Sequence, residues 1–389
     1  MPRYLVWILA IASGATVANL YYNQPLLSVM AQSFHASPQA VGLIPMLTQI
    51  GYAVGILLFV PLGDLLERRR LIVTMVSATA VALAIAALAP TLPWLIGASF
   101  AIGMSAIAAQ IIVPFAAQLT PIETRGNVVG MIMGGLFIGI LVARTVSGYV
   151  GAIQGWRLMY WLACGVMILV AVTLSKTLPR SQPSLKASYP ALMQSLVQLI
   201  RQQPILQEAS IIGAMCFGAF STFWSTLVFL LEQPPYGYGS EVAGLFGLVG
   251  VVGAIAAPLV GKVADRSSPK RTVGFGIVTT LVSFLIFWQF GHQLWGLIVG
   301  VILLDLGVQT TQISNQTRIY SLPAHLHSRL NALYIMIYFV GGAIGSYLGS
   351  IGWNRWQWNG VCAFAIAMLL VALVTFFGGL PRSFPQRQS

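Results

Sequence analysis

Charged residues are scarce in this chain of 389 residues, since Asp, Glu, Lys and Arg make up 7% of it and only 8 residues are acidic. A soluble domain averages about 25% charged residues, so an ordinary water-soluble fold is excluded. The 3 cysteines are isolated within apolar runs, which argues against a disulfide framework or a metal-ligand set. The HExxH, GxSxG and P-loop motifs are also missing, so we expect no enzyme, no metal, no cofactor and no direct use of ATP.

Hydrophobic residues make up 57% of the chain instead. They form runs of about 20 residues, which is the length of helix that spans a bilayer core of about 30 Å. We therefore predict an all-α integral membrane protein with twelve transmembrane helices, at residues 4–30, 40–62, 70–90, 94–117, 127–151, 157–177, 207–231, 241–262, 271–291, 294–314, 328–351 and 357–379.

The basic residues are distributed unevenly over the predicted spans. With the N-terminus inside, all but three of the 20 Lys and Arg residues fall at cytoplasmic ends; Arg157 and Arg355 fall outside and Arg144 lies within a span. This positive-inside pattern predicts a multi-pass protein of the cytoplasmic (inner) membrane with both termini in the cytoplasm. The net charge of +12 is then explained by topology and by anionic lipid, and nucleic acid is not an expected partner.

The chain repeats itself at an offset of about 200 residues. The segment GDLLERRR (63–70) corresponds to GKVADRSSPKR (261–271), which matches Asp64 with Asp265. Internal repeats are typical of transporter folds, which bind their substrate near the midplane between the halves. We predict two pseudo-symmetric six-helix bundles at 1–177 and 207–380, a cytoplasmic linker with an amphipathic helix at 178–206, and a cytoplasmic tail at 381–389.

Glycines recur at helical spacing in several of the predicted spans. Small residues let helix backbones approach closely, so we expect tight contacts that also allow the halves to rock. The sets are Gly130/Gly134, Gly135/Gly139, Gly244/Gly247/Gly250/Gly253 and Gly341/Gly345/Gly349.

The repeated loop carries a resemblance to a known family. Asp64 with Arg68, Arg69 and Arg70, and GKVAD with Arg266, resemble the cytoplasmic loop signature of the major facilitator superfamily. The segments NLYYNQPLL, PLGDLLERRR and ARTVSG are similar to the bacterial drug:proton antiporter branch, in a subgroup of exporters. The resemblance covers nearly the whole chain and implies the major facilitator fold with proton-coupled efflux of small molecules.

The same resemblance implies an inner gate, in which Asp64 meets a helix start near Arg329 in the other half. The gate would comprise Asp64, Arg68, Arg69, Asp265, Arg266 and Arg329. The chain departs from the branch at Ser99, where the branch has arginine, and at Ala143-Arg144, where the branch has Gly-Pro.

Two charged residues, Arg144 and Asp305, lie deep within predicted spans. A charge at that depth costs about 2.5–3.5 kcal/mol on insertion scales, so it is retained for pairing or for transport. Asp305 is the candidate proton carrier, because burial disfavours a charged carboxylate; the alternative is a static ion pair with Arg144 or a polar neighbour. Arg144 stays charged, so its candidate roles are to bind an anionic or hydrogen-bonding substrate, to hold Asp305 ionised, or to be purely structural.

Further polar residues are predicted to line a substrate cavity. Asn19, Tyr22 and Asn23 share one face of the first span at i, i+3 and i+4 spacing, and polar side chains avoid lipid. Ligand pockets combine such groups with an apolar wall, for which Trp224 is a candidate. The remaining polar candidates are Gln49, Gln110, Gln309, Gln312 and Asn315.

We therefore predict a monomeric secondary active transporter that exports a small organic molecule against proton entry by alternating access. The alternative is symport or facilitated uptake of a small polar solute such as a sugar, nucleoside or amino acid. A non-transporting membrane sensor and a membrane enzyme are remote alternatives. The sequence does not indicate which substrate is carried.

Overall fold

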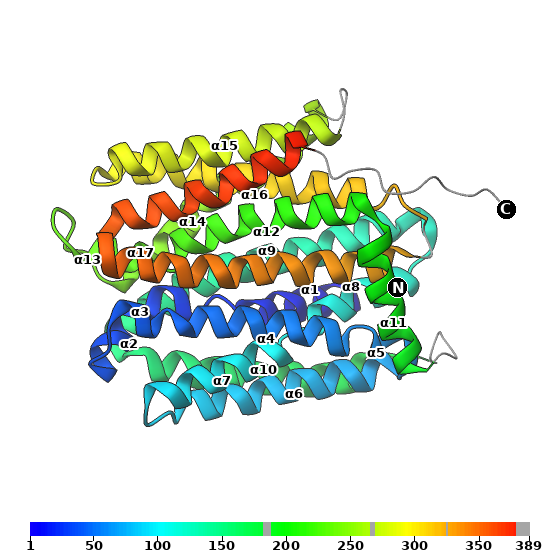
Figure 1. The fold of residues 1–389 in the computed structure, drawn as a ribbon. Helices are drawn as coiled ribbons and strands as arrows, with labels where there is room; N and C mark the ends of the chain where they lie inside the picture. The colour runs from blue at the N-terminus through cyan, green and yellow to red at the C-terminus, as the bar shows by residue number, and fades with distance from the viewer. Residues whose placement is uncertain (182–187, 265–268, 324–325, 379–389) are drawn as a thin grey trace.

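The structure is a computed structural model that describes residues 1–181, 188–264, 269–323 and 326–378. The described residues form helices joined by short turns (Figure 1). In chain order the helices are α1 (Arg3–Ala18), α2 (Asn23–Phe34), α3 (Pro38–Val41), α4 (Leu43–Phe59), α5 (Leu62–Leu65), α6 (Arg68–Ala87), α7 (Leu92–Ser105), α8 (Ala108–Gln118), α9 (Ile122–Gln154), α10 (Trp156–Thr177), α11 (Tyr189–Gln202), α12 (Pro204–Trp224), α13 (Leu227–Glu232), α14 (Ser240–Ala264), α15 (Pro269–Phe290), α16 (Leu294–Ile319) and α17 (His327–Gly378).

Ten helical segments of the described chain are long and apolar enough to cross a membrane. One of them, α17, holds two spans, because its backbone leaves the helical conformation at Trp356 and Gln357. With α14, the spans number twelve and lie within a few residues of the predicted ones. The predicted all-helical fold of two six-helix bundles is confirmed.

The two bundles lie one above the other in Figure 1, with α12 to α17 in the upper bundle and α1 to α8 with α10 in the lower one. The N-terminus and α11 lie at one end of the molecule, and α2 and α13 lie at the other. The joining helix α11 buries Leu192, Leu196 and Leu199, because these leucines recur on one face at helical spacing. We call the end with the N-terminus and α11 the basic end, since α5 and the start of α6, which begins with three arginines, lie there.

Glycines hold several helix pairs in backbone contact. A Cβ atom at Gly14 of α1 would lie 2.4 Å from the Gly135 carbonyl oxygen of α9, and one at Gly345 of α17 would lie 1.9 Å from the Gly218 carbonyl oxygen of α12. The expected close packing is absent at Gly130 and Gly134, where nothing lies within 4 Å of an added Cβ. Both of these glycines lie in the half of α9 nearer the basic end.

The first span is not one continuous helix, contrary to the sequence prediction. It breaks between α1 and α2, where residues 19–22 form turns. The cause is Pro25, which has no N–H to donate to the Tyr21 carbonyl oxygen; that oxygen accepts instead from Gln24, at 3.3 Å. The break rotates the polar residues that follow it away from the face predicted for an unbroken helix.

Candidate functional site

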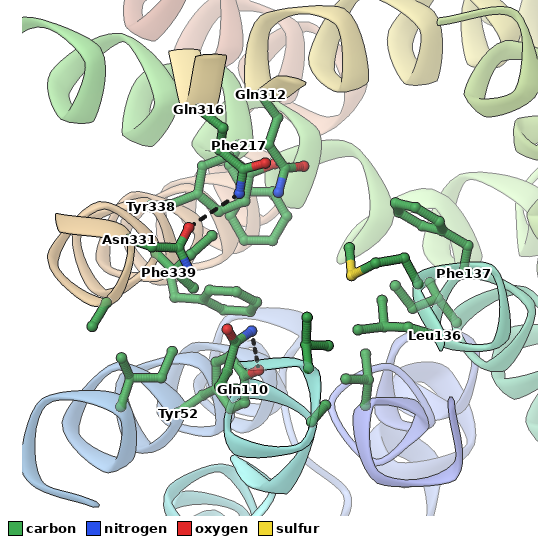
Figure 2. A pocket seen from close by; sticks show the side chains of 18 of the residues that line it. Tyr52, Gln110, Leu136, Phe137, Phe217, Gln312, Gln316, Asn331, Tyr338 and Phe339 are labelled. Carbon is green, nitrogen blue, oxygen red and sulfur yellow. Dashed lines mark hydrogen bonds between the residues drawn. The ribbon is translucent and has the colours of Figure 1, made fainter. Parts of the chain in front are cut away.

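A cavity of about 590 Å³ lies between the two bundles. Its deep end is formed by Arg144 of α9 and Asp305 of α16, and its wall continues past Gln312 to Tyr320 and Ser328. Those last residues lie at helix ends on the basic side of the molecule, so the cavity opens at the basic end. Figure 2 shows its wall, with Leu136 and Phe137 of α9 facing Gln110 and Tyr52 of one bundle and Phe217 and Tyr338 of the other.

The opposite end is closed by contacts between the bundles, which we call the seal. Gln49 of α4 donates to the Ser346 hydroxyl of α17 at 3.0 Å, and the Ser240 hydroxyl of α14 donates to the Gly148 carbonyl oxygen of α9 at 3.0 Å. At Gly42 an added Cβ would lie 1.9 Å from the Ser350 hydroxyl oxygen. The cavity is therefore accessible from one end of the molecule and blocked from the other.

The Arg144 side chain is almost fully buried at the deep end, with 2% of the residue exposed. Its Nε–H donates to the side-chain oxygen of Gln24 at 2.9 Å. Its guanidinium carbon lies 3.8 Å from the ring centre of Trp224, 5.0 Å from that of Tyr21 and 5.4 Å from that of Phe220. Cation–π attraction stabilises a desolvated guanidinium by about 2 kcal/mol or more, which helps to explain how this charge is retained in an apolar bundle.

Asp305 lies on α16 against the backbone of α14, and 6% of the residue is exposed. A Cβ at Gly250 would lie 2.7 Å from its Oδ2 atom, so the carboxylate lies close against this turn of α14. Within the described part of the chain, Asp305 makes no ion pair with Arg144, although both line the cavity. The predicted alternative of a static ion pair between them is therefore not what this structure shows.

The cavity wall above the deep end is both aromatic and hydrogen-bonding. Phe217 stacks on Tyr338 with ring centres 4.1 Å apart, and Tyr52 meets Phe339 across the bundles at 4.5 Å. Gln110 donates to the Tyr52 hydroxyl at 3.0 Å, and the Tyr338 hydroxyl donates to Gln312 at 3.4 Å.

Nearer the opening, Gln316 donates to Asn331 at 3.3 Å (Figure 2). Apolar surface with a few oriented polar groups is typical of small-molecule pockets.

Three of the predicted cavity residues, Gln110, Gln309 and Gln312, lie in the cavity wall. The others lie elsewhere. Asn19 donates to backbone oxygens of its own helix and to the Met167 sulfur. Asn23 donates to Thr48 at 3.2 Å. Tyr22 is buried outside the wall. Their predicted common face assumed a regular helix, whereas residues 19–22 form turns.

Three further predicted residues make contacts within the protein and do not line this cavity. Gln49 belongs to the seal rather than to the cavity wall. Asn315 donates to the Ala209 carbonyl oxygen at 3.2 Å, which turns it toward α12. Trp224 contacts Arg144 and does not line the main cavity, so it acts on the site only through that arginine.

The sequence prediction missed several residues of the site. Gln24 could have been noticed as a polar neighbour of Asn23 in a hydrophobic span. Nothing local distinguished Tyr21 from Tyr22, because the choice depends on the break before Pro25. The other missed residues are Tyr52, Phe217, Phe220, Asn331 and Phe339.

The described residues of the predicted gate, Asp64, Arg68, Arg69 and Arg329, lie at the basic end. Asp64 accepts from Arg68 at 2.8 Å, one turn later, and Arg69 donates to the Ser175 carbonyl oxygen. Arg329 donates to Ser195 of α11 at 3.1 Å, and among the described residues no ion pair joins it to Asp64. Asp265 and Arg266 lie outside the described residues.

A buried ion pair that the sequence did not predict also lies near this end. Glu208 of α12 accepts from Arg318 of α16 at 2.9 Å, and both side chains are about 12% exposed. No group of three or more His, Cys, Asp or Glu side chains within the described ranges is placed to hold a metal ion.

Comparison with known proteins identifies the fold family. The family model described as Major Facilitator Superfamily matches residues 7–317 and again 245–389. The chain belongs to the major facilitator superfamily. It is therefore a multi-pass membrane transporter.

Relatives of this transporter cover nearly its whole length. The "Uncharacterized transporter YgaY" of Escherichia coli O157:H7 is 40% identical over 97% of this chain and 96% of its own. The "Probable transporter SCO4007" of Streptomyces coelicolor is 30% identical over 95% of this chain and 86% of its own. A solved bacterial homologue of the human lysosomal transporter Spinster has the same fold, with a TM-score of 0.76 at 14% identity, covering 97% of this chain and 96% of that one.

Proposed function

We propose that this transporter exports a small organic molecule in exchange for protons, by alternating access of one cavity to the two sides of the membrane. The observation that carries the proposal is the cavity itself. It lies between the bundles, opens at one end only, and ends at Asp305, the single carboxylate among the described residues that line it. One chain contains the whole cavity, which supports a monomer as the working unit.

Asp305 is suited to couple protons to substrate because of where it lies. A buried charge without a partner is costly, so the carrier is most readily reoriented when the carboxylate is neutralised by a proton or by a bound group. If the two compete for Asp305, entry of one excludes the other, which is the requirement for exchange. Export, rather than uptake, is supported by the similarity of NLYYNQPLL, PLGDLLERRR and ARTVSG to the drug:proton antiporter branch.

The orientation in the membrane is part of the proposal. The basic end carries most of the lysines and arginines, so the positive-inside rule favours placing it in the cytoplasm of a bacterial inner membrane. The open cavity then faces the compartment from which an exported substrate would be collected.

The test is a panel of candidate substrates with purified protein in liposomes under an imposed pH gradient. We expect saturable flux, with substrate driven against its own gradient toward the more acidic compartment. Flux with the proton gradient, in the same direction, would indicate symport of a sugar, nucleoside or amino acid instead. Flux that ignores the pH gradient would indicate facilitated diffusion.

The Asp305→Asn variant isolates the coupling step. It should abolish transport driven by the pH gradient while exchange of labelled for unlabelled substrate continues at saturating concentration. The control is Glu123→Gln, which removes an exposed acid at the start of α9. If the Asn variant still accumulates substrate with normal proton flux, Asp305 is not the proton carrier.

A further inference from the structure

The guanidinium of Arg144 has hydrogen-bonding capacity that the protein leaves unused. Its Nε–H is bonded to Gln24, but its Nη2 atom is buried with no hydrogen-bond partner among the described residues. The rings of Trp224, Tyr21 and Phe220 approach the cation and offer no conventional acceptor. A guanidinium binds carboxylates through parallel bonds from its outer nitrogens, so the unused edge is suited to a planar oxyanion.

The carboxylate of Asp305 likewise has hydrogen-bond-accepting capacity that the protein leaves unused. Its Oδ2 atom is buried and accepts no hydrogen bond from the described residues. Leaving a buried ionised group without a partner costs several kcal/mol, and Arg144 and Asp305 do not form an ion pair with each other. The deep end of the cavity therefore holds one buried cation and one buried anion, and neither has an ion-pair partner among the described residues.

Helix α14 packs against both Arg144 and Asp305. A Cβ at Gly247 would lie 3.1 Å from the Arg144 Cβ atom, and one at Gly250, a single turn later, would lie 2.7 Å from the Asp305 Oδ2 atom. Residues three apart on a helix have side-chain positions about 5–6 Å apart. Arg144 from α9 and Asp305 from α16 thus flank the same turn of α14, within reach of a single small molecule.

Resting on the proposed transport function, we propose that the deep end binds the head of an α-amino acid or a similar small zwitterion. Its carboxylate lies on the free edge of Arg144 and its ammonium group on Asp305. Its side chain extends along the apolar wall, where Ile140, Leu141, Phe217, Phe220 and Val308 line the cavity. The ammonium group takes the place of the proton on Asp305, so substrate and proton exclude each other.

The experiment measures binding rather than transport, so the two proposals fail separately. Purified full-length protein in lipid nanodiscs is titrated by calorimetry with phenylalanine, 2-phenylethylamine and 3-phenylpropionate. These probes share an aromatic tail and differ in carrying both charges, only the ammonium or only the carboxylate. We expect phenylalanine to bind at least ~10-fold more tightly than either partner compound, because each of those leaves one buried charge unpaired.

Two variants assign the charges to the residues. Arg144→Ala should remove the advantage of phenylalanine over 2-phenylethylamine, and Asp305→Asn should remove its advantage over 3-phenylpropionate. The matched controls are Arg201→Ala and Glu123→Gln, which remove exposed charges outside the cavity. Because the comparison of the three probes needs only the unmodified protein, misfolding of a variant leaves the inference open to test.

Equal affinity for the three probes, or affinity for only one of the singly charged probes, would overturn the inference. So would the absence of binding by any of them. Binding of phenylalanine without pH-driven flux in liposomes would uphold the zwitterion site and contradict the proton-coupled transport proposed above. Proton-coupled flux of an uncharged solute with no phenylalanine binding would do the reverse.

Discussion

The two ends of this transporter are built from different chemistry. At the sealed end, the bundles are joined by glycines, serines and the amide of Gln49, and the contacts described there involve no charged side chain. Among the described residues, the ion pairs at the basic end include Asp64 with Arg68 and Glu208 with Arg318, each within one bundle. The contacts that close the sealed end are neutral and short-range, whereas the described contacts at the open end include ion pairs.

This difference bears on how each end changes state. Neutral hydrogen bonds contribute only about 0.5–1.5 kcal/mol each to stability, so the seal can separate and re-form at modest cost. Charged groups must exchange partners rather than lose them, since an unpaired buried charge is costly. Closing the basic end thus requires new partners for side chains such as Asp64, whereas opening the sealed end requires only that small residues move apart.

The largest effect is expected at Arg144, where the seal meets the cavity. Arg144→Ala should lower transport by about 100-fold or more, because losing one partner of a buried, hydrogen-bonded charge pair with the substrate costs about 2–5 kcal/mol. Arg144→Lys should fail to restore activity, since an ammonium lacks the planar fork and can deprotonate when buried. Flux in liposomes at matched membrane abundance gives the measurement.

The seal should stay closed in both Arg144 variants, because its contacts are made by other side chains. Spin labels at Gln154→Cys and Gln233→Cys, in a background lacking Cys164, Cys216 and Cys362, report the separation of the bundles at the sealed end. Normal transport by the Ala variant would show that Arg144 has no essential role.

A substitution in the seal should open it. In Gly148→Val the new Cβ would lie 2.4 Å from the Ser240 carbonyl oxygen, and backbone atoms cannot move aside without separating α9 from α14. Overpacking of this kind costs about 1–3 kcal/mol, which corresponds to a shift of about 5- to 150-fold in a two-state population. The distance between the labels at the sealed end should lengthen accordingly.

The same helix offers a matched control for that substitution. Gly130→Val adds the same side chain where nothing lies within 4 Å. Its label distances should equal those of the unmodified protein. Equal lengthening by both variants would mean that α9 responds to side-chain volume in general, and that Gly148 has no special place in the seal.

A smaller shift in the same direction is expected from Gln49→Ala. It removes the bond to Ser346 at a cost of about 1 kcal/mol, which is about a fivefold change in population. Gln39→Ala, which removes a longer and exposed contact with Asn354 at 3.4 Å, should change the population much less. If substrate affinity falls in Gln49→Ala while the label distance is unchanged, Gln49 acts on substrate and does not belong to the seal.

The smallest effect, and the one of opposite sign, is expected from Asp64→Ala. If Asp64 has a cross-bundle partner when the basic end is closed, its loss favours the open form seen here. The Asp64–Arg68 pair of the open form is lost as well, which offsets part of the shift, so we expect less than about fivefold. Spin labels at Arg125→Cys and Arg271→Cys would report the shift in population, and Glu123→Ala is the control. A shift toward the closed form would show that Asp64 is not part of the gate.

The sequence alone determined the number of spans, the limits of each span to within a few residues, and the depth of Arg144 and Asp305. These properties follow from the free energy of transferring each stretch of chain into lipid, which is a sum over neighbouring residues. The repeat of the loop at 63–70 similarly indicated two equivalent bundles, because a short motif can be recognised in a sequence without knowing which residues it contacts.

Only the tertiary structure decided which polar side chains face the cavity. The first span is interrupted before Pro25, and Tyr21, not Tyr22, lies in the cavity wall. Because α4 packs against α17, Gln49 lies in the seal. Gln24 reaches Arg144 across 120 positions of sequence. The direction of a side chain depends on the rotation of its helix, which is set by close contacts with helices distant in the chain, and no local pattern of residues contains that information.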